Sequence, residues 1–150
     1  YSLMPSSKTF LTTEQRHQLV TAIREAEGKS SGEIRVYFEK HCKKELMDRA
    51  VEVFYQLKLE KTKLRTGILI YVAYLDRVFA IIGDQGINEK VPSGFWDEAK
   101  ELMIPYFKEE QYTEGLLKGI NLAGEQLRNF FEITGTDTNE IADDIIVRDE

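Results

Sequence analysis

The sequence predicts an α/β protein, a three-layer α/β/α sandwich around a small mixed sheet that combines a parallel β-α-β unit with an antiparallel hairpin. Two nearly continuous apolar runs, residues 67–74 and 77–83, are rich in β-branched and aromatic side chains, which indicates strands buried on both faces. The connection around Asp76 is too short for a parallel crossover, so these strands must form a hairpin. An alternating segment, residues 33–38, precedes a helical pattern and should pair parallel to the first run through a right-handed crossover.

Four helical patterns surround these strands. Residues 12–28 begin with capping-box spacing and end at a glycine, and residues 44–57 repeat apolar side chains with helical period. A third helix is expected to be capped by Ser93 and to kink or restart at Pro105. Residues 116–131 carry the apolar positions of a fourth. Helices are therefore available for both faces of the sheet.

The chain of 150 residues is expected to form one domain, with residues 12–133 as the folded unit. Residues 1–11 are expected to be a disordered segment or a vector remnant. Residues 134–150 are expected to be an acidic tail, in which residues 145–147 can add a short edge strand. No apolar run reaches membrane-spanning length, so membrane insertion is not expected.

The charge balance excludes some classes of partner. A net charge of −6 repels the phosphates of nucleic acids and anionic lipids, so no nucleic-acid partner is expected. The single cysteine, Cys42, cannot form an internal disulfide, which fits a reducing compartment. With no signal peptide recognised, the expectation is a cytoplasmic monomer, with an envelope location open if a signal or anchor has been removed.

The predicted topology brings several loops to one edge of the sheet. The hairpin places Gly83-Asp84 beside Arg65-Thr66-Gly67, and parallel pairing places Ser31-Gly32-Glu33 at the same end. This favoured edge should contain Ser31, Glu33, Arg65, Thr66, Asp84, Gln85 and Asn88, with Glu89 and Asp97 close by. The opposite edge should contain Glu39, Lys40, His41, Cys42, Asp76 and Arg77.

Carboxylates, amide oxygens and glycine turns are the groups that hard cations such as Ca²⁺ and Mg²⁺ use. The candidate metal ligands are Asp84, Asn88, Glu89 and Glu33, and the candidate anion contacts are Arg65 and Lys63. A plain glycine turn, in which Asp84 bonds its own backbone, is the simpler alternative. Metal-dependent hydrolysis of a phosphoester at the same edge is another, with Asp84 holding the metal and Arg65 the phosphate.

Several short stretches, in this order and spacing, resemble the TPM domain family, formerly catalogued as a domain of unknown function. The matching stretches are residues 31–36, 65–73, 76–77, 82–87 and 104–107, and Tyr112 followed by Gly115 to Gly119. Small standalone bacterial members of the family are the most similar. The resemblance implies an α/β/α sandwich, binding of a divalent cation at loops on one edge of the sheet and, in a plant member, an acid phosphatase activity. Many members carry an aromatic-Gly-Leu-Glu sequence where this chain has Asp84-Gln85-Gly86-Ile87.

Together, the residues and the resemblance predict a soluble TPM-type domain that binds Ca²⁺ or Mg²⁺ at one edge of the sheet, with no catalytic residue assigned. A metal-dependent acid phosphatase that uses the same edge is one alternative. The other is an interaction module that helps to assemble or repair a protein complex through its helical face, with a protein partner that the residues do not specify.

Overall fold

The computed structural model describes residues 11–28, 30–131 and 145–147. The elements, in chain order, are α1 (Thr13–Glu27), β1 (Glu33–Glu39), α2 (Leu46–Gln56), the 3₁₀ turn η1 (Leu59–Lys61), β2 (Gly67–Ala73), β3 (Val78–Gly83), α3 (Gln85–Asn88), α4 (Phe95–Lys108), α5 (Tyr112–Phe131) and β4 (Ile145–Val147). The predictions for residues 1–10 and for most of 134–150 lie outside the described residues. Leu11, the first described residue, is buried in the core.

The four strands form one mixed sheet in the order β3-β2-β1-β4. β1 is parallel to β2, with Glu33 opposite Gly67, and it is also parallel to β4. β3 is antiparallel to β2, with Gly83 opposite Ile68. The predicted β-α-β unit, the hairpin and the short edge strand at residues 145–147 are therefore confirmed. β3 and β4 are the outer strands of the sheet. The favoured edge and the opposite edge named above are the loop clusters at the two ends of the strands.

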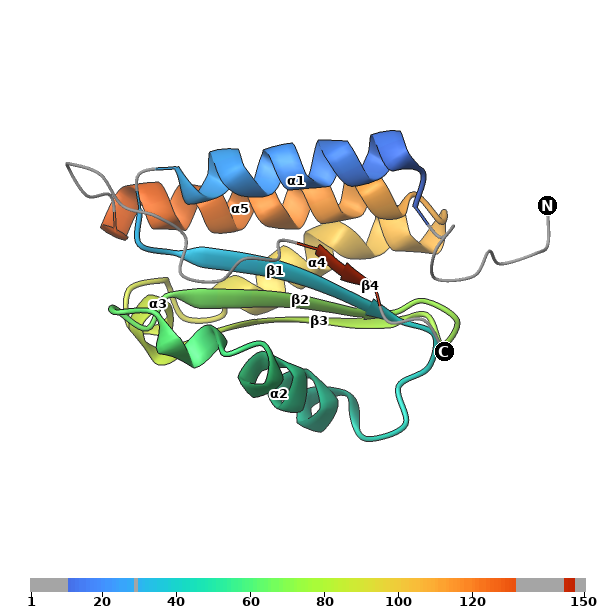
Figure 1. Ribbon diagram of the computed structural model, residues 1–150, viewed down its shortest axis with the longest axis horizontal. Coiled ribbons are helices and arrows are strands. Elements are labelled where there is room, and N and C mark those ends of the chain that lie inside the picture. Colours follow the sequence, from blue (N-terminus) through green and yellow to red (C-terminus); the bar gives the residue numbers. More distant parts are fainter. Residues whose placement is uncertain (1–10, 29, 132–144, 148–150) are drawn as a thin grey trace.

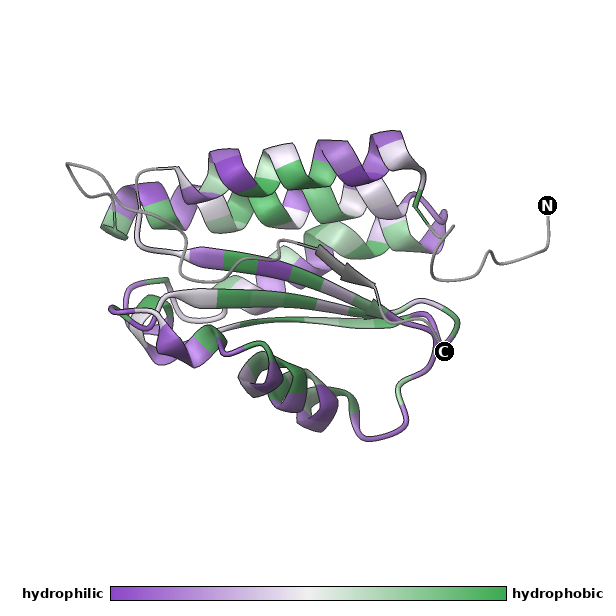
Figure 2. Cartoon of the chain, in the orientation of Figure 1, coloured by the Kyte–Doolittle hydropathy of each residue, from purple (hydrophilic) through white to green (hydrophobic). Residues whose placement is uncertain are grey.

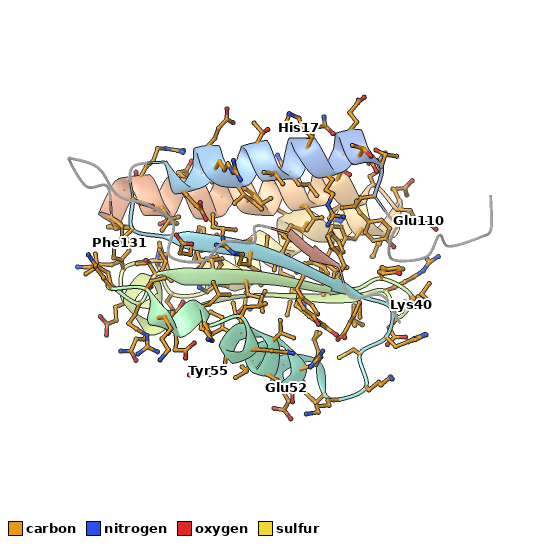
Figure 3. The ribbon with its side chains drawn as sticks, viewed as in Figure 1. His17, Lys40, Glu52, Tyr55, Glu110 and Phe131 are labelled. Carbon is orange, nitrogen blue, oxygen red and sulfur yellow. The ribbon has the colours of Figure 1, made fainter. Side chains whose placement is uncertain are left out.

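Helices cover both faces of the sheet, so the three-layer sandwich is confirmed (Figure 1). α1, α4 and α5 pack on one face, where strand residues such as Ile34, Ile70 and Ile81 form the larger part of the core. α2 packs on the other face, against a smaller cluster that includes Tyr71. Figure 2 shows hydrophobic residues on the strands and on the inner sides of the helices, with hydrophilic residues on the outer sides. His17 accordingly lies on the outer face of α1 (Figure 3).

The observed helix ends agree only in part with those predicted from the sequence. The capping box at Thr12 is present and starts α1. The prediction that Ser93 caps the third helix is wrong: α4 follows Gly94 in a left-handed conformation, with no side-chain cap. The turn is closed instead by the backbone of Phe95, which donates to the carbonyl of Pro92.

Two further details differ from the expected pattern. α4 continues through the exposed Pro105 to Lys108, so of the kink or restart expected there, the restart does not occur. In place of the glycine turn expected after β3, the structure has the short helix α3, with Asp84 at its start.

Of the described residues, no helix is both long and apolar enough to cross a membrane.

Candidate functional site

Arg65 and Asp84 form a two-pronged ion pair where β2 begins and β3 ends. Arg65 donates from Nε to Asp84 Oδ2 at 2.6 Å and from Nη2 to Oδ1 at 2.9 Å. Asp84 Oδ1 also accepts the N–H of Gln85 at 2.8 Å, and the N–H of Asp84 donates to the carbonyl of Gly67 at 2.9 Å. The hairpin thus brings Arg65 and Asp84 together, as the topology predicts, and both carboxylate oxygens have protein donors.

The two partners differ in exposure. The Asp84 side chain is 7% exposed, whereas that of Arg65 is 36% exposed. The hydrogen bonds to Asp84 are the main cause of the raised pKa of the Arg65 guanidinium. Arg65 also has a left-handed backbone, with φ of 57°, which residues with a Cβ adopt rarely. A nearly buried anion is therefore held by a cation that stands at the surface on an unusual turn.

Gly86 allows the two loops of this edge to touch. A Cβ on Gly86 would lie 1.9 Å from the carbonyl oxygen of Leu64 and 2.6 Å from that of Arg65. The N–H of Ile87 donates to the Arg65 carbonyl across the same contact, at 3.3 Å. Because the obstructing atoms are backbone, only glycine fits here without moving the loop.

A third loop joins the edge through hydroxyl groups. Thr66 Oγ1 donates to the carbonyl of Ser31 at 3.2 Å, and the two hydroxyl oxygens lie 3.4 Å apart. The N–H of Thr66 donates to Thr62 Oγ1 at 2.8 Å. The structure therefore brings together the loops that the sequence assigns to this edge.

Glu33 faces a different environment from Asp84. It is buried in β1 and accepts from Arg35 Nη2 at 2.9 Å, while Arg35 Nη1 lies 3.3 Å from Glu27. Glu27 also accepts the N–H of Ile34 at 2.8 Å. Glu33 thus belongs to a buried ion-pair cluster on the central strand. Residues two apart share one face of a strand, so the Glu33-x-Arg35 spacing is the signal that could have indicated this pair.

The other predicted residues of the edge have separate roles. Asn88 donates from Nδ2 to the Gly83 carbonyl at 2.8 Å, and its Oδ1 accepts from Trp96 Nε1 at 2.6 Å. This amide ties α3 to both β3 and α4. The side chains of Glu89 and Lys63 are exposed, and no hydrogen bond or ion pair of theirs is found among the described residues.

The arrangement limits the kind of metal site that is available. Within the described part of the chain, no group of three or more His, Cys, Asp or Glu side chains is placed to hold one metal ion. Asp84, Asn88 and Asp97 line the same end of a groove of about 430 Å³. A cation could therefore meet a mixed set of carboxylate, amide and water oxygens here, and at Asp84 it would compete with Arg65.

The opposite edge contains a second arginine–carboxylate pair. Arg49 Nε and Nη2 donate to Glu39 at 2.8 and 3.0 Å, and the Tyr71 hydroxyl donates to the same carboxylate. Burial, followed by this hydrogen bond, raises the pKa of Tyr71. The sequence placed Glu39 at this edge but gave no sign of Arg49 or Tyr71, which come from α2 and from the middle of an apolar strand.

The hairpin turn at the opposite edge is held by Asp76. His41 Nδ1 lies 2.9 Å from Asp76 Oδ1, and the N–H of Cys42 donates to Oδ2 at 2.7 Å. The contact with His41, followed by that with Cys42, lowers the pKa of Asp76. Arg77 instead pairs with Glu110 at 3.1 Å. Asp76 therefore joins the hairpin turn to the loop after β1, and Arg77 joins it to the loop between α4 and α5.

The three layers, the mixed sheet and the loop cluster at Asp84 define a small α/β/α domain. The family model of the TPM domain, whose name carries the word phosphatase, matches residues 6–126. The chain belongs to the TPM domain family. A comparison with functionally curated proteins found no significant match.

Solved structures support the assignment. The chain is similar to the NMR structure of the BA42 protein from the psychrophilic bacterium Bizionia argentinensis, with 43% sequence identity, a TM-score of 0.83, and coverage of 91% of this chain and 94% of that one. It is similar to the N-terminal domain of a P. gingivalis protein, with 21% identity, a TM-score of 0.68 and coverage of 85% and 83%. The N-terminal domain of the cg2496 protein from Corynebacterium glutamicum gives 11% identity, a TM-score of 0.65 and coverage of 95% and 92%. The last two likenesses concern the fold alone.

Proposed function

We propose that this TPM domain binds a divalent cation, Mg²⁺ or Ca²⁺, at Asp84, in exchange for the guanidinium of Arg65. The observation that carries the proposal is the asymmetry of the pair: a nearly buried carboxylate is neutralised by an arginine that is more than one third exposed. Arg65 is already partly solvated, so water can replace much of what it loses when it leaves, and the incoming cation compensates the charge left on Asp84. A divalent ion brings twice the charge to a carboxylate in a less polar environment.

The donor set fits a hydrated site better than a closed one. Mg²⁺ is commonly held by one or two carboxylates and keeps several of its waters, whereas Ca²⁺ takes six to eight oxygen ligands. Asp84 supplies the buried carboxylate, and Asn88 and Glu89 are candidate outer ligands at the α3 end. Glu33 is the weakest candidate, because its carboxylate is engaged with Arg35. The proposal therefore favours Mg²⁺ and a weak site.

Amide NMR can test this exchange. Titration of the ¹⁵N-labelled protein with MgCl₂ or CaCl₂ should shift the Gln85 and Gly86 amides and the Arg65 Nε–H signal, because the Arg65–Asp84 hydrogen bonds break. Asp84→Asn should abolish these shifts. The matched control Asp76→Asn, at the opposite edge, should keep them. Spectra without change up to about 10 mM cation, beyond the weakest calcium modules, would refute the proposal.

A phosphatase activity is the second candidate, and the name of the family model favours it. Arg65 and Lys63 lie on one loop, so an arginine released from Asp84 would be free to bind a phosphate beside the cation. In such a hydrolysis, water attacks phosphorus and releases one proton to solvent, the P–O ester bond breaks, and the leaving oxygen takes up one proton from solvent as the alcohol departs. Turnover of p-nitrophenyl phosphate with Mg²⁺ should then be lost in both Asp84→Asn and Arg65→Ala. Turnover that survives in both variants removes this edge as the catalytic site.

A further inference from the structure

β3 is an edge strand that has little of the usual protection of such strands within the described residues, apart from Lys100 of α4, whose Nζ lies 5.2 Å from the centroid of the Phe79 ring. Among the described strands it pairs with β2 alone, and its six residues, Val78 to Gly83, include no charged residue and no proline. Natural proteins commonly protect an edge with charge, proline, shortness or a covering segment. The other edge strand, β4, has only three residues. β3 therefore presents the longer apolar edge of this sheet.

The register shows which backbone groups of β3 face outward. Asp84 donates to the carbonyl of Gly67 directly opposite, which marks a hydrogen-bonded pair. Paired and unpaired positions alternate along an antiparallel ladder. The N–H and C=O groups of Phe79, Ile81 and Gly83 thus face away from β2. Asn88 Nδ2 donates to the outward-facing carbonyl of Gly83. Among the described residues, the backbone groups of Phe79 and Ile81 make no backbone hydrogen bond outside the sheet.

A groove runs along this strand between α2 and α4. One part, of about 430 Å³, is lined by residues 80–83 of β3 and by both helices. A second part, of about 370 Å³, continues past Val78 and Phe79, and Lys100 lines both parts. Figure 1 shows β3 at the margin of the sheet with α2 beside it. The two helices therefore flank the β3 edge and leave a groove along it.

Apolar side chains line the α2 side of the groove. Met47, Val51 and Tyr55 are 45%, 43% and 53% exposed. Spaced four residues apart, they form one stripe on the helix, and all three line the larger part of the groove. Tyr55 is labelled on α2 in Figure 3. On the α4 side, Trp96 and Ile104 line the groove. An added strand would place alternate side chains against these two walls.

The charges at the two ends of the groove differ. Lys108 and Arg77, which also pairs with the exposed Glu110, line the end near the start of β3, whereas Asp84 and Asp97 line the end near its finish. A strand that runs antiparallel to β3 would bring its carboxyl end to the basic residues and its amino end to the acidic ones. The protein's net charge of −6 disfavours a second copy as the occupant.

We propose that β3 is a docking edge that binds an extended segment of a partner protein by strand addition, antiparallel to β3. The segment would carry apolar side chains at alternating positions and an acidic residue or free carboxyl terminus beside Arg77 and Lys108. Backbone hydrogen bonds to Phe79 and Ile81 would supply affinity, and the groove walls would supply selectivity. The proposal requires no cation and is independent of the one at Asp84.

Selection from a random peptide library tests this inference. The library should display peptides of six residues, the length of β3, with free carboxyl termini, and the selection should be run in EDTA so that no cation takes part. Enriched peptides should alternate apolar residues and end in an acidic residue. Val51→Lys, an exposed change in the groove, should weaken a selected peptide about tenfold, because it puts a charge against apolar side chains. Gln56→Lys, which adds the same charge on α2 outside the groove, should leave binding unchanged.

Hydrogen exchange gives the second readout. In the free protein, the amides of Phe79 and Ile81 should exchange fast while those of Ala80 and Ile82 are protected by β2. A bound peptide should slow exchange at Phe79 and Ile81. The proposal is overturned if no peptide is enriched, if selected peptides bind the Val51→Lys variant equally, or if they perturb other residues. Protection of both amides in a dimer of the free protein, detected by analytical ultracentrifugation, would assign the edge to a second copy and also overturn it.

Discussion

Arg49–Glu39 and Arg65–Asp84 are two arginine–carboxylate pairs of the same geometry at opposite ends of one sheet. Each arginine binds both carboxylate oxygens, and each carboxylate is about 7% exposed. The arginines differ: Arg49 lies on α2 and its side chain is 12% exposed, whereas Arg65 stands on a loop at 36%. Glu39 also has the Tyr71 hydroxyl as a further buried donor.

The difference separates a structural pair from an exchangeable one. Removing one partner of a buried pair leaves an uncompensated charge in a poorly solvated place, so such a pair resists exchange. At the Asp84 edge, water can solvate Arg65 as soon as it moves away. The same chemical groups can therefore fix α2 to the sheet at one end and leave a replaceable counter-ion at the other.

The largest expected effect is on stability at the Glu39 end. Glu39→Ala should lower the free energy of unfolding by about 3 kcal/mol, because Tyr71 loses its acceptor and Arg49 is left with the more exposed carboxylate of Glu52. Urea denaturation followed by circular dichroism measures this loss. Asp84→Ala, measured alongside, should cost clearly less, since the arginine that it leaves can turn to solvent. Equal losses in the two variants would contradict the distinction between the pairs.

The intermediate effect is a pH dependence at Tyr71. The raised pKa means that the folded protein keeps the hydroxyl proton, whereas the unfolded chain releases it above about pH 10. The stability contributed by neutral Tyr71 is therefore complete below that pH and is lost as the pH rises above it. Tyr71→Phe should cost about 1 kcal/mol at neutral pH through the lost hydrogen bond.

Urea titrations from about pH 7 to 11 measure this dependence, because they span the ordinary pKa of tyrosine. The Tyr71→Phe variant should lose less stability than the parent protein on the alkaline side, so that the two curves converge. Tyr55→Phe, at an exposed tyrosine, should follow the parent curve throughout. Parallel curves for the parent protein and Tyr71→Phe would show that Tyr71 does not remain neutral in the folded state.

The sheet and the meeting of the loops could be predicted because both depend on local patterns. An apolar run without alternation indicates a strand covered on both faces, and a connection as short as that at Asp76 allows only a hairpin. Once the hairpin is fixed, the start of β2 and the end of β3 must adjoin. The proximity of Arg65 and Asp84 follows from that topology, whereas their two-pronged ion pair is seen in the structure.

The partners across layers could not be predicted in the same way. Arg49 reaches Glu39 only because α2 crosses the sheet at one particular rotation and register, which depend on the packing of Ala50 and Phe54. Helical periodicity shows which face is apolar and does not say which polar residue at its margin meets a strand. The helix α3 was missed for a related reason. Its glycine has low helix propensity, and the segment is held by the Asp84 cap and by contact with residues 64–65.

The smallest expected effect is a change in cation affinity, and it comes from Arg65. Arg65→Gln removes the competing charge from Asp84, so Mg²⁺ should bind about fivefold more tightly or better, the lower range of such couplings. The free energy of unfolding should fall by less than in Glu39→Ala, because the nearly buried Asp84 carboxylate keeps the N–H of Gln85 as a donor. Arg49→Gln is the matched change at the opposite pair: it should destabilise the fold and leave Mg²⁺ affinity unchanged. Mg²⁺ titrations followed at the Gln85 amide measure both affinities. If Arg65→Gln binds Mg²⁺ no better than the parent protein, Arg65 does not compete with the cation and the two pairs share a purely structural role.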